Sequence, residues 1–213
     1  MIKVLCFDFD GTITDTKDLV KKTFFEVLDR LEFNYNKIKA EKLFGEKTEV
    51  MLKKLGFDEK NIMKIKRNFF DELILKIEDL NIALCSPIRP LFLLKKKYKF
   101  FLISNNNRIF LEAALKKLNI NKLFDEVYSD EDFLTKDKML KEIFKKEKIS
   151  NKEAVYIGDR FSDVIAAKRA GCYSIVTHNI CSWSSLKEIE KVKPDFIISN
   201  FNDLKKVLDF LNS

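Results

Sequence analysis

The chain begins with the largely apolar run IKVLCF at residues 2–7, which is followed directly by DFDGT at residues 8–12. A short run of this kind predicts a buried strand of a parallel sheet. Residues just past such a strand face a crevice in which open α/β sheets bind ligands, and we therefore place Asp8 and Asp10 in a crevice. Because neighbouring carboxylates repel each other, this position favours a bound cation or a proton held by one of them. The competing interpretation is an Asp-rich loop that caps a helix.

Short apolar runs alternate with helical patterns along most of the remaining chain. The apolar runs predict strands at residues 2–7, 99–103, 126–128, 154–157, 174–177 and 196–198. Apolar residues at helical spacing predict helices at residues 110–118, 138–146 and 163–170. This alternation is typical of an α/β fold, in which helices cover both faces of a parallel sheet.

The first two predicted strands are separated by about ninety residues, although a crossover between parallel strands needs only a dozen or more. Helical periodicity fills the gap at residues 19–31, 40–43, 48–55 and 59–80, with breaks at Gly45 and Gly56. We therefore predict two domains. They are an α/β core made of residues 1–15 and 83–213, and an inserted α-helical domain at residues 16–82.

The composition is that of an ordinary globular protein of 213 residues, 46% of them hydrophobic. No apolar run approaches the roughly 20 residues that a bilayer span needs, and we find no secretory signal, so we expect a cytoplasmic protein. Without a C-x-x-C pair, the four cysteines predict reduced thiols. They are Cys6, Cys85, Cys172 and Cys181. Because His178 is the only histidine, catalysis by a histidine pair is excluded.

The formal net charge is +7 and the sequence pI is about 9.0. The lysines are scattered over the predicted helix faces, and the longest basic run is Lys95–Lys97. No aromatic-studded RNA motif or zinc-ligand spacing accompanies this run, so we expect no nucleic-acid partner. Without a membrane-spanning run, we also expect no membrane partner. A basic surface equally favours a small phosphorylated metabolite. We expect a monomer or a small homo-oligomer.

Polar residues also follow two further predicted strands and precede one predicted helix. These positions are Ser104-Asn105, Lys136 and the stretch GDRFSD at residues 158–163. Because the carboxyl ends of parallel strands meet at one edge of the sheet, we expect them to gather near Asp8 and Asp10. Four aspartates, a hydroxyl, an amide and a lysine suit phosphoryl transfer to a carboxylate nucleophile.

A carboxylate attacks a phosphate only where cations cancel the repulsion, and Mg²⁺ prefers hard oxygen ligands. We predict Asp8 as the nucleophile. The predicted Mg²⁺ ligands are the side chains of Asp8, Asp159 and Asp163 and the backbone carbonyl of Asp10. Lys136 supplies a positive charge to the nucleophile and the phosphoryl group. Asp10 protonates the leaving group and then deprotonates the attacking water.

The remaining polar groups are predicted to hold the substrate. Ser104 donates to phosphoryl oxygens, Gly11 lets the backbone approach an anion, and Asn105 and Thr12 complete the predicted substrate contacts. Structural alternatives stay open, because Ser104-Asn105 and Asp163 also suit helix starts. For the active-site lysine, Lys138 is the alternative to Lys136.

These motifs resemble those of the haloacid dehalogenase superfamily of phosphohydrolases, in its phosphoglycolate phosphatase-like and β-phosphoglucomutase-like branch with a helical cap. In chain order they are Asp8-x-Asp10-Gly-Thr, Ser104-Asn105, Lys136 and Gly158-Asp159-x-x-x-Asp163. One departure is Asp137, which replaces the family's usual proline after the lysine. The resemblance implies a Rossmann-like core with the first strand central, and a cap that closes over the substrate.

The resemblance further implies an Mg²⁺-dependent phosphatase that acts on a small phosphate monoester through an aspartyl-phosphate. Asp10 favours phosphate chemistry, because the family's dehalogenases lack an acid at that position. A sugar-phosphate mutase is one alternative, with Lys47 in place of the arginine that mutases carry in the cap. A non-catalytic phospho-ligand-binding protein is another. A phospho-acceptor receiver domain is disfavoured, because residues 126–129 offer no acceptor aspartate.

Overall fold

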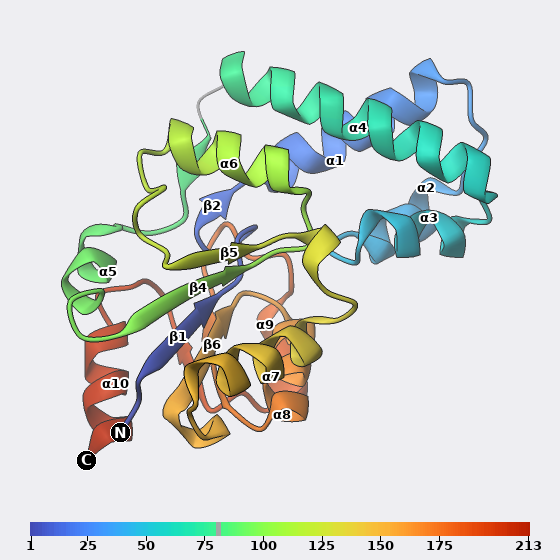
Figure 1. Cartoon of the computed structure of the whole chain (residues 1–213). Coiled ribbons are helices and arrows are strands. Elements are labelled where there is room, and N and C mark those ends of the chain that lie inside the picture. The colour runs from blue at the N-terminus through green and yellow to red at the C-terminus, as the bar shows by residue number, and fades with distance from the viewer. Residues whose placement is uncertain (80–81) are drawn as a thin grey trace.

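The computed structural model describes residues 1–79 and 82–213. Its centre is a parallel sheet with the strand order β5-β4-β1-β6-β7-β8 (Figure 1). The strands are β1 (Val4–Phe7), β4 (Lys99–Ile103), β5 (Glu126–Tyr128), β6 (Ala154–Gly158), β7 (Tyr173–Thr177) and β8 (Phe196–Ile198). The predicted α/β fold with a parallel sheet is confirmed. The first strand lies inside the sheet, between β4 and β6.

Helices cover both faces of this sheet because side chains alternate along each strand. One face is covered by α7 (Lys136–Glu147) and α8 (Phe161–Ala170), and the other by α5 (Arg89–Leu94), α6 (Arg108–Lys117) and α10 (Leu204–Asn212). In β1, Val4 and Cys6 belong to the apolar cluster under α7 and α8. Leu5 and Phe7 belong to the cluster on the opposite face. A further helix, α9 (Leu186–Lys191), packs beside α8.

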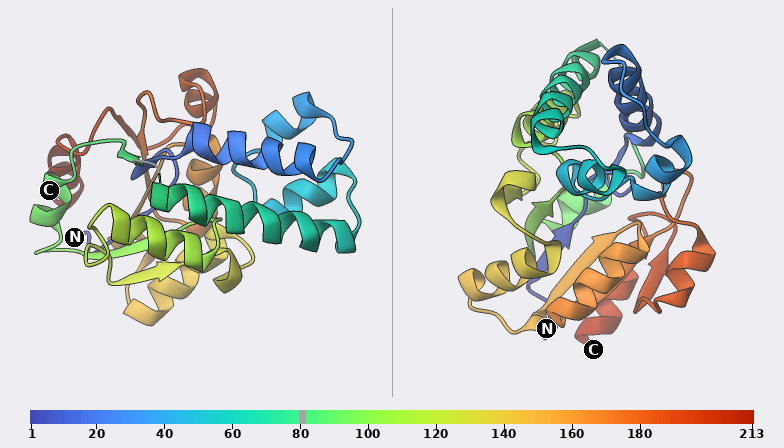
Figure 2. Two further views of the ribbon diagram at one scale, coloured as in Figure 1. Left: turned by 90° about the horizontal axis from the view of Figure 1, so that it is seen from above. Right: turned by 90° about the vertical axis from the view of Figure 1, so that its right-hand side faces the viewer.

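Four helices form a separate lobe, which we call the helical lobe. They are α1 (Lys17–Arg30), α2 (Lys37–Leu43), α3 (Thr48–Leu55) and α4 (Glu59–Asp79). Figure 2 shows the lobe projecting beyond one end of the sheet. The chain enters and leaves it through β2 (Thr14–Asp15) and β3 (Ala83–Leu84), which pair antiparallel. The lobe falls within residues 16–82, where an inserted helical domain is predicted; residues 80 and 81 lie outside the described part.

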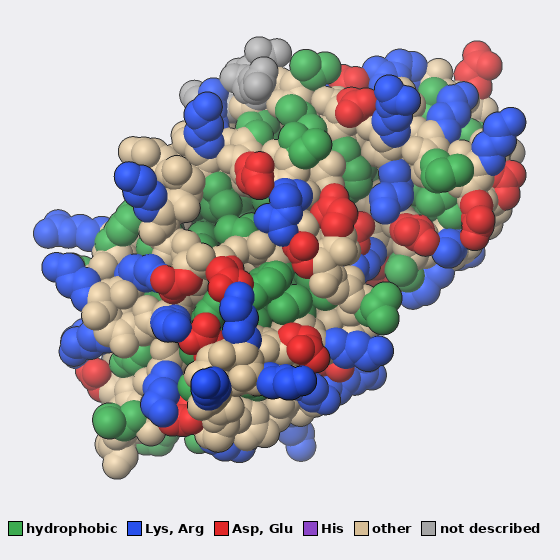
Figure 3. Space-filling model, viewed as in Figure 1, with side chains coloured by type: hydrophobic (Ala, Val, Ile, Leu, Met, Phe, Trp, Pro, Cys, Tyr) green, Lys and Arg blue, Asp and Glu red, His purple; other side chains and the backbone are tan. Residues whose placement is uncertain are grey.

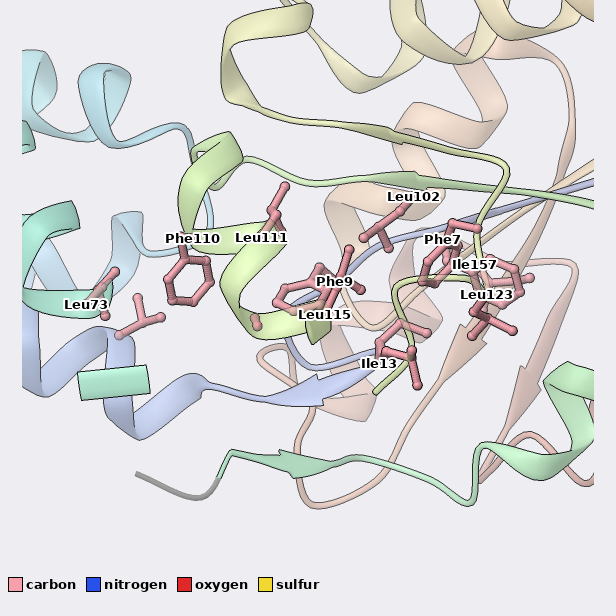
Figure 4. Packing of buried hydrophobic residues seen from close by; sticks show 14 of the residues in the cluster. Phe7, Phe9, Ile13, Leu73, Leu102, Phe110, Leu111, Leu115, Leu123 and Ile157 are labelled. Carbon is pink, nitrogen blue, oxygen red and sulfur yellow. The ribbon is translucent and has the colours of Figure 1, made fainter. Parts of the chain in front are cut away.

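The helical lobe and the core share one apolar cluster. Leu73 of α4, Phe110 of α6 and Phe9, just past β1, are fully buried in it. Figure 4 shows Phe110 between the other two side chains. The rings of Phe9 and Phe110 meet edge-on, with centroids 6.3 Å apart. Because burying a side chain of this size stabilises by about 1.5–3 kcal/mol, this packing helps hold the lobe against the core.

Helix starts differ most from the sequence-based expectation. The helix α7 begins at Lys136 instead of residue 138, and α8 begins at Phe161 instead of residue 163. The first turn of α7 is polar, and in α8 the first residue, Phe161, is followed by the polar Ser162 and Asp163, so hydrophobic spacing does not mark either start. The strands predicted at residues 99–103, 126–128 and 196–198 match the structure.

Charges of both signs are interspersed on the surface. Figure 3 shows lysine and arginine side chains among acidic ones over the visible face. Several form pairs along a helix, such as Lys53 with Glu49 at 2.7 Å. This pattern is typical of a solvated surface. Among the described helices, none has the combination of length and hydrophobicity that a membrane span requires.

Candidate active site

A tight turn after β1 brings Asp8 and Asp10 to the same pocket. The carbonyl oxygen of Phe9 accepts hydrogen bonds from the backbone N–H groups of Ile13 and Thr14, at 2.9 and 3.1 Å. The chain therefore reverses direction directly after the strand. Asp8 is only 5% exposed, so its carboxylate lies at the base of the pocket rather than in bulk water.

Gly11 makes this turn possible. It has a φ of +78°, and a Cβ atom there would lie 2.4 Å from Oδ2 of Asp159. The next residue, Thr12, is fully buried, and its hydroxyl donates to Oδ1 of Asp159 at 3.4 Å. Gly11 and Thr12, the predicted substrate contacts, therefore lie against Asp159. Neither is among the described residues that line the pocket.

Three carboxylates form a compact buried cluster at the carboxyl ends of β1 and β6. One oxygen each of Asp8, Asp159 and Asp163 lies within 4.8 Å of the others. The ammonium of Lys136, at the start of α7, lies 2.9 Å from Oδ1 of Asp8 and 2.9 Å from Oδ1 of Asp163. Lys138 is exposed on the same helix. The structure thus brings Lys136, and not Lys138, to the carboxylates.

Burial dominates the electrostatics of this cluster. Burial raises the pKa of Asp8 to about 7. The ammonium of Lys136 opposes this rise, and repulsion from Asp163 adds to it. Burial, followed by repulsion from Asp163 and Asp8, raises the pKa of Asp159 well above its usual range. Burial alone would lower the pKa of Lys136, but its pairs with Asp163 and Asp8 raise it, so this lysine stays charged. The single ammonium of Lys136 cannot balance three carboxylates, so the cluster favours an additional cation.

The donor set fits a Mg²⁺ ion. Mg²⁺ prefers carboxylates and other hard oxygen ligands. One carboxylate oxygen each of Asp8, Asp159 and Asp163 lies within 4.8 Å of the others, so the three side chains present such oxygens to one place. Asp159 is further oriented by the backbone N–H of Trp183, which donates to its Oδ2 at 2.6 Å. These three side chains are the residues that would hold the ion.

The side chain of Asp10 is held apart from this cluster. Thr16 donates to its Oδ1 at 2.5 Å, and Nδ2 of Asn106 donates to its Oδ2 at 2.6 Å. Burial raises the pKa of Asp10, although these two hydrogen bonds oppose the rise. A carboxyl group with a raised pKa holds a proton more readily, as a general acid must. Sequence reasoning misses Thr16 and Asn106, and the only signal for Asn106 is its place in an asparagine run after β4.

Ser104 and Asn105 take different positions after β4. Ser104 is fully buried, and its Oγ accepts a hydrogen bond from the backbone N–H of Asn106 at 3.1 Å. Asn105 lines the pocket and donates to the carbonyl oxygen of Gly45 in the helical lobe at 2.9 Å. The N-cap residue of α6 is Asn107, so neither predicted residue caps that helix.

The pocket lies between the core and the helical lobe and encloses about 550 Å³, part of it open to solvent. Its core side carries the polar residues described above. Its lobe side is mostly apolar, with Val20, Phe44, Met51 and Phe69. Two more core residues, Arg160 and Trp183, line it. Sequence reasoning assigns neither a role, because Arg160 lies inside a motif read for its aspartates and Trp183 lies in a loop without a pattern. A pocket of this kind suits a small molecule.

Lys47 is turned away from this pocket. Its ammonium donates to the carbonyl oxygens of Asp130, at 2.6 Å, and of Phe133, and it lies 2.9 Å from Oδ1 of Asp130. These contacts join the helical lobe to the core loop after β5. Lys47 is therefore engaged by the core loop, and it is not among the described residues that line the pocket.

Comparison with known proteins identifies a family for this chain. The family model for haloacid dehalogenase-like hydrolases matches residues 5–177. A protein of Caldanaerobacter subterraneus subsp. tengcongensis, provisionally named pyrophosphatase PpaX, is 28% identical over 218 residues, which cover 97% of this chain and 94% of the relative. A hydrolase from Pseudomonas syringae has a similar structure, with a TM-score of 0.82, 18% identity, and coverage of 97% and 98%. CbbY from Rhodobacter sphaeroides, solved in complex with phosphate, also has a similar structure. Its TM-score is 0.82 at 18% identity, and the match covers 96% of each chain.

Proposed function

Because the chain belongs to the haloacid dehalogenase-like hydrolase family, we propose that it is an Mg²⁺-dependent phosphatase of a small phosphate monoester, with Asp8 as the nucleophile. The observation that carries the proposal is the contrast between the two carboxylates of one turn. Asp8 lies 2.9 Å from the ammonium of Lys136 and belongs to the acidic cluster. Asp10 is held apart by neutral donors. Carboxylates in such different surroundings suit a nucleophile and a general acid.

In the first half of the reaction, a carboxylate oxygen of Asp8 attacks the phosphorus atom. The bond between phosphorus and the leaving oxygen breaks, and Asp10 gives its proton to that oxygen. Lys136 offsets the repulsion between the anionic nucleophile and the anionic phosphoryl group. The product is an aspartyl-phosphate on Asp8 and a free alcohol.

In the second half, water attacks the phosphorus of the aspartyl-phosphate and Asp10 accepts its proton. The bond to Asp8 breaks, which releases inorganic phosphate and restores the carboxylate. Thr16 and Asn106 hold the carboxyl group of Asp10 in place through both halves. Asp8, Asp159 and Asp163 would hold Mg²⁺, and the ion, when bound, would neutralise charge on the nucleophile and the phosphoryl group.

The helical lobe supports a small substrate. Its apolar residues cover the pocket above the carboxylates, and the contact from Asn105 to Gly45 joins the lobe to the core beside the site. This partial cover limits contact with bulk water, which strengthens the charge interactions inside the pocket. The name of the relative, pyrophosphatase PpaX, supports a phosphorylated substrate with a short non-reacting part.

Phosphate release from a panel of phosphorylated metabolites tests this function. We expect release with Mg²⁺, none with a chelator, and none from Asp8→Asn. Asp71→Asn on α4, whose side chain is 67% exposed, is a matched control that should keep full activity. Equal release by wild type and a folded Asp8→Asn protein would rule out the proposed nucleophile. No release from any substrate by the wild type with Mg²⁺ would contradict the phosphatase itself.

A further inference from the structure

One cation in the pocket has no part in the proposed chemistry. Arg160 lines the pocket directly before α8. Its Nε and Nη1 atoms are buried and have no hydrogen-bond partner among the described residues. Lys136, the other pocket cation, is paired with two carboxylates instead. The two cations therefore differ, because one is satisfied by the protein and the other still has free donors.

The guanidinium group of Arg160 is fixed between the helical lobe and a core loop. A Cβ atom added to Gly45 of the lobe would lie 1.0 Å from Nη1, so only a glycine leaves room for it. Cζ also lies over the ring of Trp183, 5.8 Å from the ring centroid. The Nε1 atom of Trp183 is also buried without a partner. Two side chains thus bring unsatisfied donors to the same part of the pocket.

Buried donors without acceptors cost free energy, and a charged donor costs more than a neutral one. Structural packing alone does not explain why an arginine is placed here, because an apolar residue would fill the space without this cost. Among the described residues, no carboxylate forms an ion pair with Arg160. A pocket-lining acid in the lobe, Glu46, is paired with Lys54 at 2.7 Å. An anion that enters the pocket would supply the acceptor that these buried donors lack.

We propose that Arg160, with Nε1 of Trp183, binds a second anionic group of the substrate. The substrate class is then a small phosphate ester or anhydride whose non-reacting part carries a carboxylate or another phosphoryl group. This inference rests on the proposed function, because it assumes that the reacting phosphoryl group lies at Asp8. Arginine suits the task, since its planar fork matches the two oxygens of a carboxylate or phosphate.

Binding to a protein that cannot turn over the ligand tests this inference. The Asp8→Asn protein, with Mg²⁺ present, is titrated calorimetrically with 2-phosphoglycolate, with pyrophosphate and with ethyl phosphate, which lacks a second anionic group. We expect Arg160→Gln in this background to weaken binding of at least one of the two doubly anionic ligands ten-fold or more relative to ethyl phosphate. Arg160→Lys should recover part of the loss. The control Arg169→Gln removes the same charge from an exposed position on α8 and should leave the ratio unchanged.

The outcomes separate the two sources of the second anion. A selective loss for 2-phosphoglycolate alone assigns the position to a carboxylate, and a selective loss for pyrophosphate alone assigns it to a phosphoryl group. An equal loss for all three ligands, no loss, or no binding of either doubly anionic ligand by Asp8→Asn would overturn the proposal. Turnover of ethyl phosphate by the wild type is measured in parallel. If the wild type turns over ethyl phosphate but Arg160→Gln does not selectively weaken binding of a doubly anionic ligand, this inference is wrong and the proposed function stands.

Discussion

The Nζ atom of Lys136 lies 2.9 Å from Oδ1 of Asp8, although the two positions are 128 residues apart in the sequence of 213. The contact exists because β1 ends, and α7 begins, at the same edge of the parallel sheet. The lysine side chain is 13% exposed and the aspartate side chain 7%, so water screens the pair weakly. This pairing keeps positive charge at the proposed nucleophile before a substrate arrives.

Lys136→Ala should therefore lower kcat/KM by about 10²- to 10³-fold, because the charge acts mainly in the transition state. Lys138→Ala, two residues along the same helix and exposed, should keep activity within about two-fold. Steady-state kinetics with Mg²⁺ on both variants makes the comparison. Loss of activity in Lys138→Ala with retention in Lys136→Ala would show that the assignment of the lysine is wrong.

Asp10→Asn should slow turnover by about 10²- to 10⁴-fold for alkyl phosphates, whose leaving groups need a proton. The rate of the first step should fall less for an aryl phosphate with an acidic leaving group, because that oxygen leaves without being protonated. A presteady-state burst of the phenol measures the first step separately. An equal slowing of that step for alkyl and aryl substrates would argue against Asp10 as the acid.

Gly45→Ala and Gly56→Ala form a matched pair in the helical lobe. Both glycines have positive φ, +89° and +99°, so each alanine should cost about 1–2 kcal/mol of stability. Only at Gly45 does the new Cβ meet a neighbour, Nη1 of Arg160, while nothing lies within 4 Å at Gly56. We expect Gly45→Ala alone to lower kcat/KM, by about ten-fold, for the doubly anionic substrates. Equal kinetics for the two variants would show that the position of Arg160 does not matter to catalysis.

Acid should weaken the core loop that follows β5. Asp132 accepts hydrogen bonds from the backbone N–H and the hydroxyl of Ser129, at 2.6 and 2.7 Å, and from Arg108. Burial raises its pKa, but these donors outweigh burial and lower it below 3.8. A lowered carboxyl pKa contributes stability above the unfolded value, and this contribution is lost as the pH falls through the folded value. Asp132→Asn should cost about 1 kcal/mol in urea denaturation at pH 7, and the difference should shrink below pH 4. A difference that stays constant with pH would contradict this role.

The sequence predicts the acidic cluster because its members follow strands or start helices. Asp8 and Asp159 come directly after β1 and β6, which are neighbours in the sheet. In a parallel sheet, this placement alone brings the side chains to one edge. Lys136 and Asp163 lie in the first turns of the helices that pack on the same face. Local pattern and sheet topology therefore determine this part of the site.

The rest of the site depends on contacts that no local pattern encodes. Asn106 reaches Asp10 only because of the turn after β4, and Thr16 does so because the chain enters the helical lobe there. Arg160 acquires its position from Gly45 in the helical lobe and from Trp183 in a loop of the core. Such contacts are set by tertiary packing, which periodicity and motif spacing do not describe.

Direct detection of the phosphorylated enzyme tests the proposed chemistry at its centre. Wild type and Asp10→Asn are mixed with Mg²⁺ and substrate, quenched in acid within one turnover, and digested for mass spectrometry. We predict a phosphoryl group on the peptide that contains Asp8, in larger amount in Asp10→Asn, because hydrolysis of the intermediate needs the base. Asp8→Asn should give none. Phosphate release without a phosphorylated Asp8, or with the phosphoryl group on another residue, would contradict nucleophilic attack by Asp8.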